Sequence, residues 1–365
     1  MLDINISILK NKYTEEALAA RQEGKKIYIF GAGVAGQIVE KQFLEPYGIK
    51  ADYYVEDDNF FNGERSVLGI PVIPYTKVNP IDTEILLLVA YCFSFPNVFD
   101  FPTFNIKGKV FIGDPGTFAG CRITDGIFDS NFFKENYDSF NNFYDLLSDN
   151  ESKIIMKNFI KSRITSNCDY LKDVWHKNQY FDSTVIDLKK ITKYVDCGAY
   201  TGDTYEDLIR NFNNWNGIAY LLDPEKENIE ILKNKYEKNE NINIIPKGAW
   251  NEKKELFFSN TRGDTGFVSS DGVKIEVDTI DNILDGKCVD FIKMDIEGSE
   301  YNALLGAKRT IQEFVPTLAI CVYHKKDDLI KIPELIHSFN DDYNFYLRIY
   351  KPYSLELVLY AIKKR

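Results

Sequence analysis

Two segments of the sequence share a pattern in which an apolar stretch leads to an acidic residue and then breaks into a glycine turn. The first spans residues 195–204, with Gly198 and Gly202, and the second spans residues 290–300. Glycine at the end of a strand lets the backbone bend sharply and approach a ligand closely. A chain that repeats strand, turn and helix in this way is restricted to an α/β fold with parallel strands.

The same two segments predict a bound nucleoside. A Gly-x-x-x-Gly turn with an acidic residue ahead of it is a common way to hold a nucleoside, rather than a pyrophosphate, at a strand end. The second segment brings Asp295, Glu297 and Glu300 to what we expect to be a neighbouring strand end. Together the segments predict S-adenosylmethionine binding and methyl transfer.

Length and charge exclude several classes of function. At 365 residues the chain exceeds the usual size of one hydrophobic core, so two domains are the first expectation. A net charge of −11 would repel phosphates, which argues against nucleic acid and anionic membranes as partners. The longest apolar run, residues 85–93, is too short to span a bilayer, so no membrane insertion is expected.

The cysteines predict a reducing compartment. Six cysteines are scattered along the chain without a Cys-x-x-Cys pair: Cys92, Cys121, Cys168, Cys197, Cys288 and Cys321. Buried reduced thiols are therefore expected rather than disulfides or a zinc site. Since the N-terminus also carries no basic-then-apolar signal, the sequence predicts a cytoplasmic protein.

The rhythm of apolar segments predicts three parts. Residues 1–116 form a smaller Rossmann-like α/β domain, residues 117–190 a helical connector or cap, and residues 191–365 a methyltransferase domain. The first part opens with a helix over 11–23, with Thr14 as its expected N-cap. Its strands are expected at 26–30, 51–55, 69–73, 85–90 and 110–112. The connector is expected to hold helices at 128–147, from 148 onward, and at 168–178.

From residue 194 the α/β alternation resumes. Strands are expected at 194–197, 219–222, 242–245, 289–294 and 317–322, with helices between them, among them one at 299–312. Residues 254–259 and 272–277 resemble a hairpin. Two alternating strands, at 343–350 and 355–362, close the chain. Five α/β units followed by a terminal antiparallel hairpin match the seven-stranded, Rossmann-like sheet of class I methyltransferases.

Six segments of the second half resemble, in order and spacing, the FkbM methyltransferase family. They are residues 195–204, 223–228, 248–250, 277–281, 292–300 and 320–325. Since residues 147–181 also resemble the extended N-terminal part of bacterial members, the resemblance covers about residues 145–362. The sequence departs from the family pattern at Asp223-Pro224, where family members frequently have a Glu-Pro pair. The resemblance implies S-adenosylmethionine-dependent O-methylation, commonly of a sugar or other hydroxyl in glycan or natural-product biosynthesis.

The predicted cofactor site gathers residues from several strand ends. Its members are Asp196, Gly198, Ala199, Tyr200, Gly202, Asp223, Gly248, Ala249, Trp250 and Asp295. Asp223 is expected to bind the ribose hydroxyls, as acidic residues do at that position of dinucleotide folds, and it can also cap the following helix. Trp250 stands where the adenine edge is usually held, with plain core packing as the alternative.

The predicted catalytic residues are His324, Asp295 and Glu297. His324 follows a strand end and is a candidate base for the acceptor hydroxyl. Three acids as close as Asp295, Glu297 and Glu300 repel one another unless a cation, a proton or donors intervene. Two functional readings stay open: direct contact with sulfonium and acceptor, or a Mg²⁺ or Ca²⁺ site. The structural alternative is that Glu297 or Glu300 caps the next helix and pairs with Lys293 or Arg309.

A second nucleotide site is predicted in the first part of the chain. Gly31, Gly33 and Gly36 follow an expected strand, and Asp57 lies about twenty residues on, as in dinucleotide folds. This region also resembles the N-terminal domain of bacterial sugar O-acetyltransferases, which hold a nucleotide-sugar. Because no residues for hydride transfer are evident, a nucleotide-sugar or a scaffolding role ranks above NAD(H) chemistry. The expected partner is a small-molecule or glycan substrate, and a homodimer is left open.

Overall fold

The structure is a computed structural model that describes residues 1–78, 84–90, 104–119, 127–212, 215–259, 267–269 and 272–364. Cys92, Cys121 and the end of the apolar run at 85–93 lie outside these residues. Contacts divide the chain into two units. Unit 1 comprises Met1–Asp138, Ile154–Trp175 and Lys351–Leu355; unit 2 comprises Ser139–Lys153, His176–Tyr350 and Glu356–Arg365. The division into residues 1–116, 117–190 and 191–365 stays a prediction.

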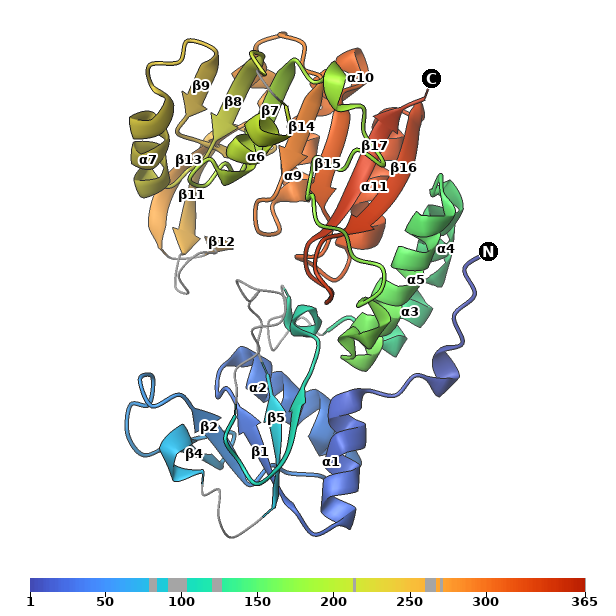
Figure 1. Cartoon of the computed structure of the whole chain (residues 1–365), viewed down its shortest axis with the longest axis vertical. Helices are drawn as coiled ribbons and strands as arrows, with labels where there is room; N and C mark the ends of the chain where they lie inside the picture. The colour runs from blue at the N-terminus through green and yellow to red at the C-terminus, as the bar shows by residue number, and fades with distance from the viewer. Residues whose placement is uncertain are drawn as a thin grey trace. The chain divides into compact units, whose positions relative to one another are not determined.

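Unit 2 is built on the predicted seven-stranded sheet. Its strands are β7 (Lys193–Cys197), β8 (Ile218–Leu222), β9 (Ile242–Ile245), β14 (Phe291–Met294), β15 (Thr317–Cys321), β16 (Tyr343–Ile349) and β17 (Leu357–Lys363). They lie in the order β9-β8-β7-β14-β15-β17-β16 (Figure 1). β17 is antiparallel to both of its neighbours, and the other pairs are parallel. The class I methyltransferase sheet with its terminal hairpin is therefore confirmed.

The order of the strands reverses between β7 and β14. From β7 the chain builds outward through β8 to β9, and it then returns to place β14 and β15 on the other side of β7. In open α/β sheets, ligands bind at such a reversal, in the crevice outside the carboxyl ends of the strands. The glycine turn after β7 and the acidic segment after β14 both start at this edge of the sheet.

A second, four-stranded sheet of unit 2 has the order β10-β13-β11-β12. Its strands are β10 (Gly248–Ala249), β11 (Lys254–Ser259), β12 (Phe267–Ser269) and β13 (Val273–Asp278). β11 pairs with β13 in antiparallel register, from Lys254 opposite Val277 to Phe258 opposite Val273. The predicted hairpin-like pairing is thus present, and the short β12 lies beside β11 at the edge.

The helices of unit 2 follow its strands. They are α4 (Tyr137–Leu146, from its third residue), the 3₁₀ turn η7 (Leu188–Lys190), α6 (Asp203–Asn211), α7 (Lys226–Tyr236), α8 (Ile280–Leu284), α9 (Glu300–Leu305), α10 (Lys308–Phe314) and α11 (Asp328–Phe339). The single helix predicted at 299–312 is two helices. The break falls at Gly306, where an added Cβ would lie 1.9 Å from the carbonyl oxygen of Trp250.

Unit 1 contains a six-stranded sheet in the order β3-β4-β2-β1-β5-β6. Its strands are β1 (Lys26–Phe30), β2 (Tyr53–Glu56), β3 (Arg65–Val67), β4 (Ile70–Pro74), β5 (Ile85–Val89) and β6 (Gly108–Ile112). All pairs are parallel except β3 with β4. Along β1, Ile27 and Ile29 join one buried cluster, while Tyr28 and Phe30 join another. Both faces of this sheet are therefore covered, as a parallel sheet requires.

The helical segments of unit 1 are mostly short. They are η1 (Ile6–Ile8), α1 (Lys12–Gln22), α2 (Val34–Ile38), the π-helix η2 (Val39–Leu44), η3 (Glu45–Tyr47), η4 (Tyr75–Lys77), η5 (Pro115–Phe118), α3 (Ser130–Glu135), most of α5 (Asn150–Thr165) and η6 (Cys168–Tyr170). The helix predicted at 168–178 is wrong, because only η6 forms and turns follow it. Among the described residues, no helix is both long and apolar enough to cross a bilayer.

Candidate functional site

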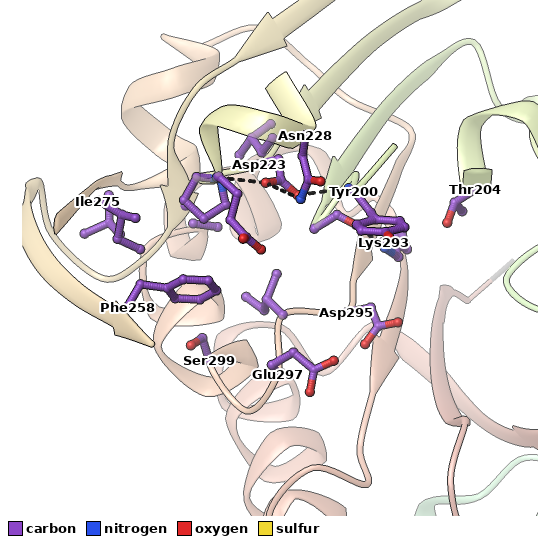
Figure 2. Close-up of a pocket in the computed structure, with 18 of the residues that line it drawn as sticks. Tyr200, Thr204, Asp223, Asn228, Phe258, Ile275, Lys293, Asp295, Glu297 and Ser299 are labelled. Carbon is purple, nitrogen blue, oxygen red and sulfur yellow. Dashed lines mark hydrogen bonds between the residues drawn. The ribbon is translucent and has the colours of Figure 1, made fainter. Parts of the chain in front are cut away.

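A cavity of about 360 Å³ lies in unit 2 at the carboxyl ends of β7, β8 and β14. Its lining also includes residues of β10, β11 and β13, so both sheets of the unit contribute to it. Figure 2 shows Asp223 and Asn228 on one side, Phe258 and Ile275 on a second, and Lys293, Asp295 and Glu297 facing them. The cavity therefore occupies the crevice that the reversed strand order creates.

Most of the predicted cofactor residues line this cavity. Those in the lining are Gly198, Tyr200, Asp223, Gly248, Ala249, Trp250 and Asp295. Asp196, Ala199 and Gly202 are outside it. Glu297 lines it as well, and His324 lies behind it. Their binding of a cofactor stays a prediction, although the fold brings them to one place.

Gly198, directly after β7, lies against the residue that follows β14. Its φ is +80°, and an added Cβ would lie 2.0 Å from the carbonyl oxygen of Asp295. The position therefore excludes any side chain, both for conformation and for space. Gly202 has a different role, because a Cβ there would meet the ring of Tyr236 at 2.8 Å. It lets α6 begin close to α7.

Asp196 is fully buried and pairs with a lysine rather than facing the cavity. Its Oδ1 lies 3.0 Å from Nζ of Lys293, and its Oδ2 accepts a hydrogen bond from the hydroxyl of Tyr194 at 2.8 Å. Lys293 also donates to the carbonyl oxygen of Gly198 at 2.8 Å. Burial would lower the pKa of Lys293, but the charges of Asp196 and Asp295 outweigh it and raise that pKa. A charged lysine thus ties the ends of β7 and β14 together.

Asp223 holds the turn after β7 to the start of α7. Its Oδ2 accepts from the amide of Tyr200 at 2.9 Å, and its Oδ1 accepts from the amide of Glu225 at 2.9 Å and from Asn228 at 3.1 Å (Figure 2). Burial raises the pKa of this carboxyl to about 6. Sequence reasoning missed Glu225, which also lines the cavity and is less buried than Asp223. Both carboxylates are therefore candidates for hydrogen bonding to a ligand.

An apolar wall of the cavity comes from the four-stranded sheet. Phe258 of β11 and Ile275 of β13 face the cavity (Figure 2). Val277 of β13 and Trp250, which follows β10, also belong to the lining. Sequence reasoning missed Phe258 and Ile275 as site residues, although the hairpin pattern that carries them was visible. An apolar wall beside two carboxylates suits a nucleoside, which has an aromatic base and a polar ribose.

Asp295 is fixed by a tyrosine from a distant part of the chain. Its Oδ2 accepts a hydrogen bond of 2.7 Å from the hydroxyl of Tyr180. Burial would raise the pKa of Asp295, but the positive charges of Lys293 and His324 outweigh it and hold that pKa below its usual value. The ring of Tyr180 also lies 5.3 Å from Nζ of Lys293. Sequence reasoning missed Tyr180 as a site residue, although it lies within the stretch 147–181 that resembles the family.

His324 lies among three carboxylates. Its Nδ1 is 3.0 Å from Oε1 of Glu300, and its Nε2 is 3.4 Å from Oδ1 of Asp295 and 3.6 Å from Oε2 of Glu297. Burial would lower the pKa of the imidazole, but the three acids raise it well above its usual value. Burial raises the pKa of Glu297 to about 7. The predicted catalytic residues are therefore brought together.

Glu300 has part of the structural role that is the alternative to a functional one. Oε1 of Glu300 accepts from the amide of Ile296 at 2.9 Å, so this side chain stabilises the turn before α9. Lys293 pairs with Asp196 instead of Glu297 or Glu300. The backbone amide of Arg309 donates to Asp281. Glu300 thus combines a contact with the preceding turn and its approach to His324.

Strained backbone is concentrated around the cavity. Among the described non-glycine residues, eight have positive φ, and four of them line the cavity: Tyr180, Tyr200, Glu297 and Glu356. Such conformations cost roughly 1–3 kcal/mol each and persist where the surroundings impose them. The Nε2 of Gln179 donates to Oε2 of Glu356 at 2.6 Å, which fixes one of these residues. The strain is consistent with a functional site.

The predicted second nucleotide site belongs to unit 1. Gly31 follows β1 with a φ of +103°, and a Cβ on Gly36 would lie 1.8 Å from the carbonyl oxygen of Gly31. Among the described residues, none beyond the immediate chain neighbours of Gly33 has a heavy atom within 4 Å of its Cβ position. Asp57 follows β2 and accepts hydrogen bonds from the amide and side chain of Asn59. The geometry of a strand, a glycine turn and a helix is present, and its ligand stays a prediction.

Comparisons with known proteins agree with this fold. Residues 196–346 match the family model of the methyltransferase FkbM domain. None of the curated proteins compared with the chain matches it. The crystal structure of methyltransferase FkbM from Methylobacillus flagellatus KT is similar with a TM-score of 0.68 and 24% identity, over 98% of this chain and 96% of that chain. This likeness shows a shared fold.

A more distant likeness is to fibrillarin from Aeropyrum pernix, whose structure contains natively bound S-adenosyl-L-methionine. It has 11% identity and a TM-score of 0.33, over 48% of this chain and 69% of that chain, and it carries no argument about this chain. The segment that matches the methyltransferase FkbM domain, residues 196–346, begins within β7 and ends within β16 of the seven-stranded sheet.

Proposed function

We propose that the protein is an S-adenosylmethionine-dependent O-methyltransferase that acts on a hydroxyl of a sugar or glycan. The observation that carries the proposal is the cavity itself. It lies where the strand order reverses, and it is lined by the turn after β7 and by the acidic ends of β8 and β14. The FkbM domain match over residues 196–346 supports methyl transfer as the reaction.

The cavity suggests how the cofactor is oriented. The ribose hydroxyls would donate to Asp223 and Glu225, because these carboxylates lie together at the end of β8. The adenine ring would pack against Phe258 and Ile275. The methionine end would then extend past Gly198 toward Asp295. This orientation directs the methyl group toward the cluster of Asp295, Glu297 and His324.

The acceptor is proposed to be rich in hydroxyl groups. Carboxylates accept hydrogen bonds from hydroxyl donors, and Asp295, Glu297 and Glu356 all line the cavity. In the reaction, the acceptor oxygen attacks the methyl carbon, and the electron pair of the carbon–sulfur bond remains on sulfur. The hydroxyl proton is lost to a base or to water. In-line alignment of oxygen, methyl and sulfur accounts for much of the rate.

Calorimetry with S-adenosylhomocysteine, the expected product, tests the cofactor site. Wild-type protein is expected to bind it with micromolar affinity, and Asp223→Asn and Glu225→Gln are each expected to weaken binding about tenfold through loss of a charge-assisted hydrogen bond. Glu227→Gln is the control, because Glu227 is exposed on α7 and outside the cavity lining. No binding by the wild-type protein would refute the proposed function.

We also propose nucleotide or nucleotide-sugar binding at the glycine turn of unit 1, which would deliver an activated sugar to the methyltransferase. Two features favour it: Gly31 has a positive φ, and no described residue beyond its chain neighbours lies within 4 Å of the Cβ position of Gly33, so these residues leave the backbone accessible between β1 and α2. The alternative at this turn is NAD(P) binding, with an oxidoreductase or scaffold role. Calorimetry with a uridine diphosphate sugar and with NAD⁺ separates the two, and binding of neither would remove both.

A further inference from the structure

Three side chains beside the cavity form a group that suits a metal ion. Oδ1 of Asp295, Oε2 of Glu297 and Nε2 of His324 lie within 4.8 Å of one another. Figure 2 shows the carboxylates of Asp295 and Glu297 at the same wall of the cavity. Two ligands on one ion, with bonds of about 2.0–2.2 Å, are separated by roughly 3.0–3.6 Å. The distances of 3.4 and 3.6 Å from Nε2 to the two carboxylates fall in that range.

Two buried atoms of this group lack hydrogen-bond partners among the described residues. His324 is only 6% exposed, and within the described part of the chain neither its Nε2 nor Oδ1 of Asp295 has a hydrogen-bond partner. Leaving buried polar atoms without partners is costly. A cation between them would satisfy both atoms at once. The missing hydrogen-bond partners of these two atoms do not follow from the number of acidic residues nearby.

The surroundings fix the ligands in the manner typical of metal sites. A metal-binding histidine usually presents its other ring nitrogen to a carboxylate, which sets the tautomer and the orientation of the ring. Here Nδ1 of His324 lies 3.0 Å from the fully buried Glu300, which is itself held by the amide of Ile296. Asp295 is held in turn by the hydroxyl of Tyr180, which binds Oδ2 and leaves Oδ1 for the ion.

We propose that Asp295, Glu297 and His324 bind a divalent cation that accepts both oxygen and nitrogen ligands, such as Mn²⁺. Two carboxylates and one imidazole leave coordination positions open, and these face the cavity that Asp295 and Glu297 line. Water fills them in the free protein, and an oxygen of the acceptor takes one of them during turnover. Binding of the cation does not depend on the proposed function, whereas the role of its open coordination positions rests on that function.

Binding of Mn²⁺ by the full-length, chelator-treated protein tests the proposal. Free Mn²⁺ is measured by electron paramagnetic resonance during titration with manganese chloride. One Mn²⁺ per chain is expected, with an affinity at least tenfold lower in Glu297→Gln and Asp295→Asn. Thermal unfolding of each variant checks that its fold is retained, because Gln and Asn are near-isosteric replacements.

Asp328→Asn is the matched control. Asp328 is buried beside Glu300 and His324, forming a second cluster that does not reach the cavity lining. Its substitution is expected to leave Mn²⁺ affinity unchanged within about twofold. Loss of binding in Asp328→Asn but not in Glu297→Gln, or no binding by the wild-type protein at millimolar Mn²⁺, would overturn the proposal. Calorimetry with S-adenosylhomocysteine on the same metal-free protein reports separately on the cofactor site.

Discussion

The imidazole of His324 meets the carboxylate of Glu300 at 3.0 Å between Nδ1 and Oε1, and Glu300 is fully buried. The buried acid fixes the ring and leaves Nε2 directed at Asp295 and Glu297, at 3.4 and 3.6 Å. The amide of Ile296 holds Glu300 from the other side. Glu300 is therefore a positioning residue, and the orientation of His324 depends on it.

Glu300→Gln is expected to lower the pKa of His324 while preserving the fold. Glutamine keeps an acceptor for the amide of Ile296, but it removes the nearest negative charge that raises the pKa of the imidazole. With metal-free protein, the His324 signal is expected to titrate at lower pH in the variant than in the wild type. Proton NMR can follow it, because the chain has only three histidines. An unchanged titration in a folded variant would contradict the positioning role.

The raised pKa of His324 determines how the effect of Glu300→Gln on stability depends on pH. A histidine whose pKa rises on folding contributes stability that is present below its unfolded pKa of about 6.5 and is lost as pH rises through the folded value. The difference in thermal stability between wild type and Glu300→Gln is therefore expected to be larger at pH 6 than at high pH. His337→Gln identifies one of the other two signals and serves as the control.

The buried pair of Lys293 and Asp196 gives a second prediction. Lys293→Met is expected to destabilise the protein by about 3–5 kcal/mol, because it leaves the fully buried Asp196 without its counter-charge. The double variant with Asp196→Asn is expected to recover much of that loss, since no buried charge remains. Urea unfolding of the two single variants and the double variant measures the coupling. Simple additivity of the single effects would show that the pair does not act as a unit.

The seven-stranded sheet could be predicted because its strands are marked locally. Buried parallel strands appear as continuous apolar runs, and the turns after β7 and β14 carry glycine next to an acid. The edge of the sheet to which these turns belong follows from the fold class alone. For the same reason Gly198, Asp223 and Asp295 could be placed near one cavity without knowledge of their contacts.

Contacts that depend on the packing of distant segments could not be predicted. Tyr180 reaches Asp295 from 115 positions away, and the resemblance of its own stretch to the family carried no information about that contact. The predicted N-cap of α1 was Thr14, but Asn11 caps that helix and Thr14 donates to the carbonyl of Phe43. Two nearby polar residues compete for one cap, and the tertiary partner of Thr14 decides between them. Local pattern alone carries no information about that partner.

Asp223 predicts a pH dependence of cofactor affinity. Burial raises its pKa to about 6, so in the free protein the carboxyl becomes protonated as pH falls below that value. The protonated form is a poorer acceptor for ribose hydroxyls, so affinity for S-adenosylhomocysteine is expected to fall several-fold between pH 7.5 and pH 5. Calorimetry at both pH values measures the change, and Asp223→Asn is expected to remove most of it. An equal fall in the variant would assign the titration to another group.

The close approach at Gly198 predicts an unusually large effect of one methyl group. In Gly198→Ala, the new Cβ would meet the carbonyl oxygen of Asp295 at 2.0 Å, so β7 and β14 must separate. We expect a loss of at least about 3 kcal/mol in stability, together with loss of S-adenosylhomocysteine binding. Gly286→Ala is the matched control: its φ of +76° is similar, but no described residue beyond its chain neighbours has a heavy atom within 4 Å of its Cβ position. It is expected to cost only about 1–2 kcal/mol, from backbone strain alone. Equal effects of the two substitutions would show that the clash is relieved by a small shift.

The glycine turn of unit 1 allows packing to be separated from ligand binding. Gly36→Ala is expected to destabilise unit 1, because its Cβ would meet the carbonyl oxygen of Gly31 at 1.8 Å. Gly33→Ala is expected to change stability by no more than about 1 kcal/mol, since Gly33 is a helix N-cap and its Cβ position has no contact within 4 Å from the described residues beyond its chain neighbours. If a nucleotide binds at this turn, Gly33→Ala weakens that binding without unfolding the unit, because the methyl group occupies the space that a phosphate would approach. Thermal unfolding and nucleotide calorimetry on the two variants make the distinction. Undiminished nucleotide binding in Gly33→Ala would place the ligand elsewhere in the protein.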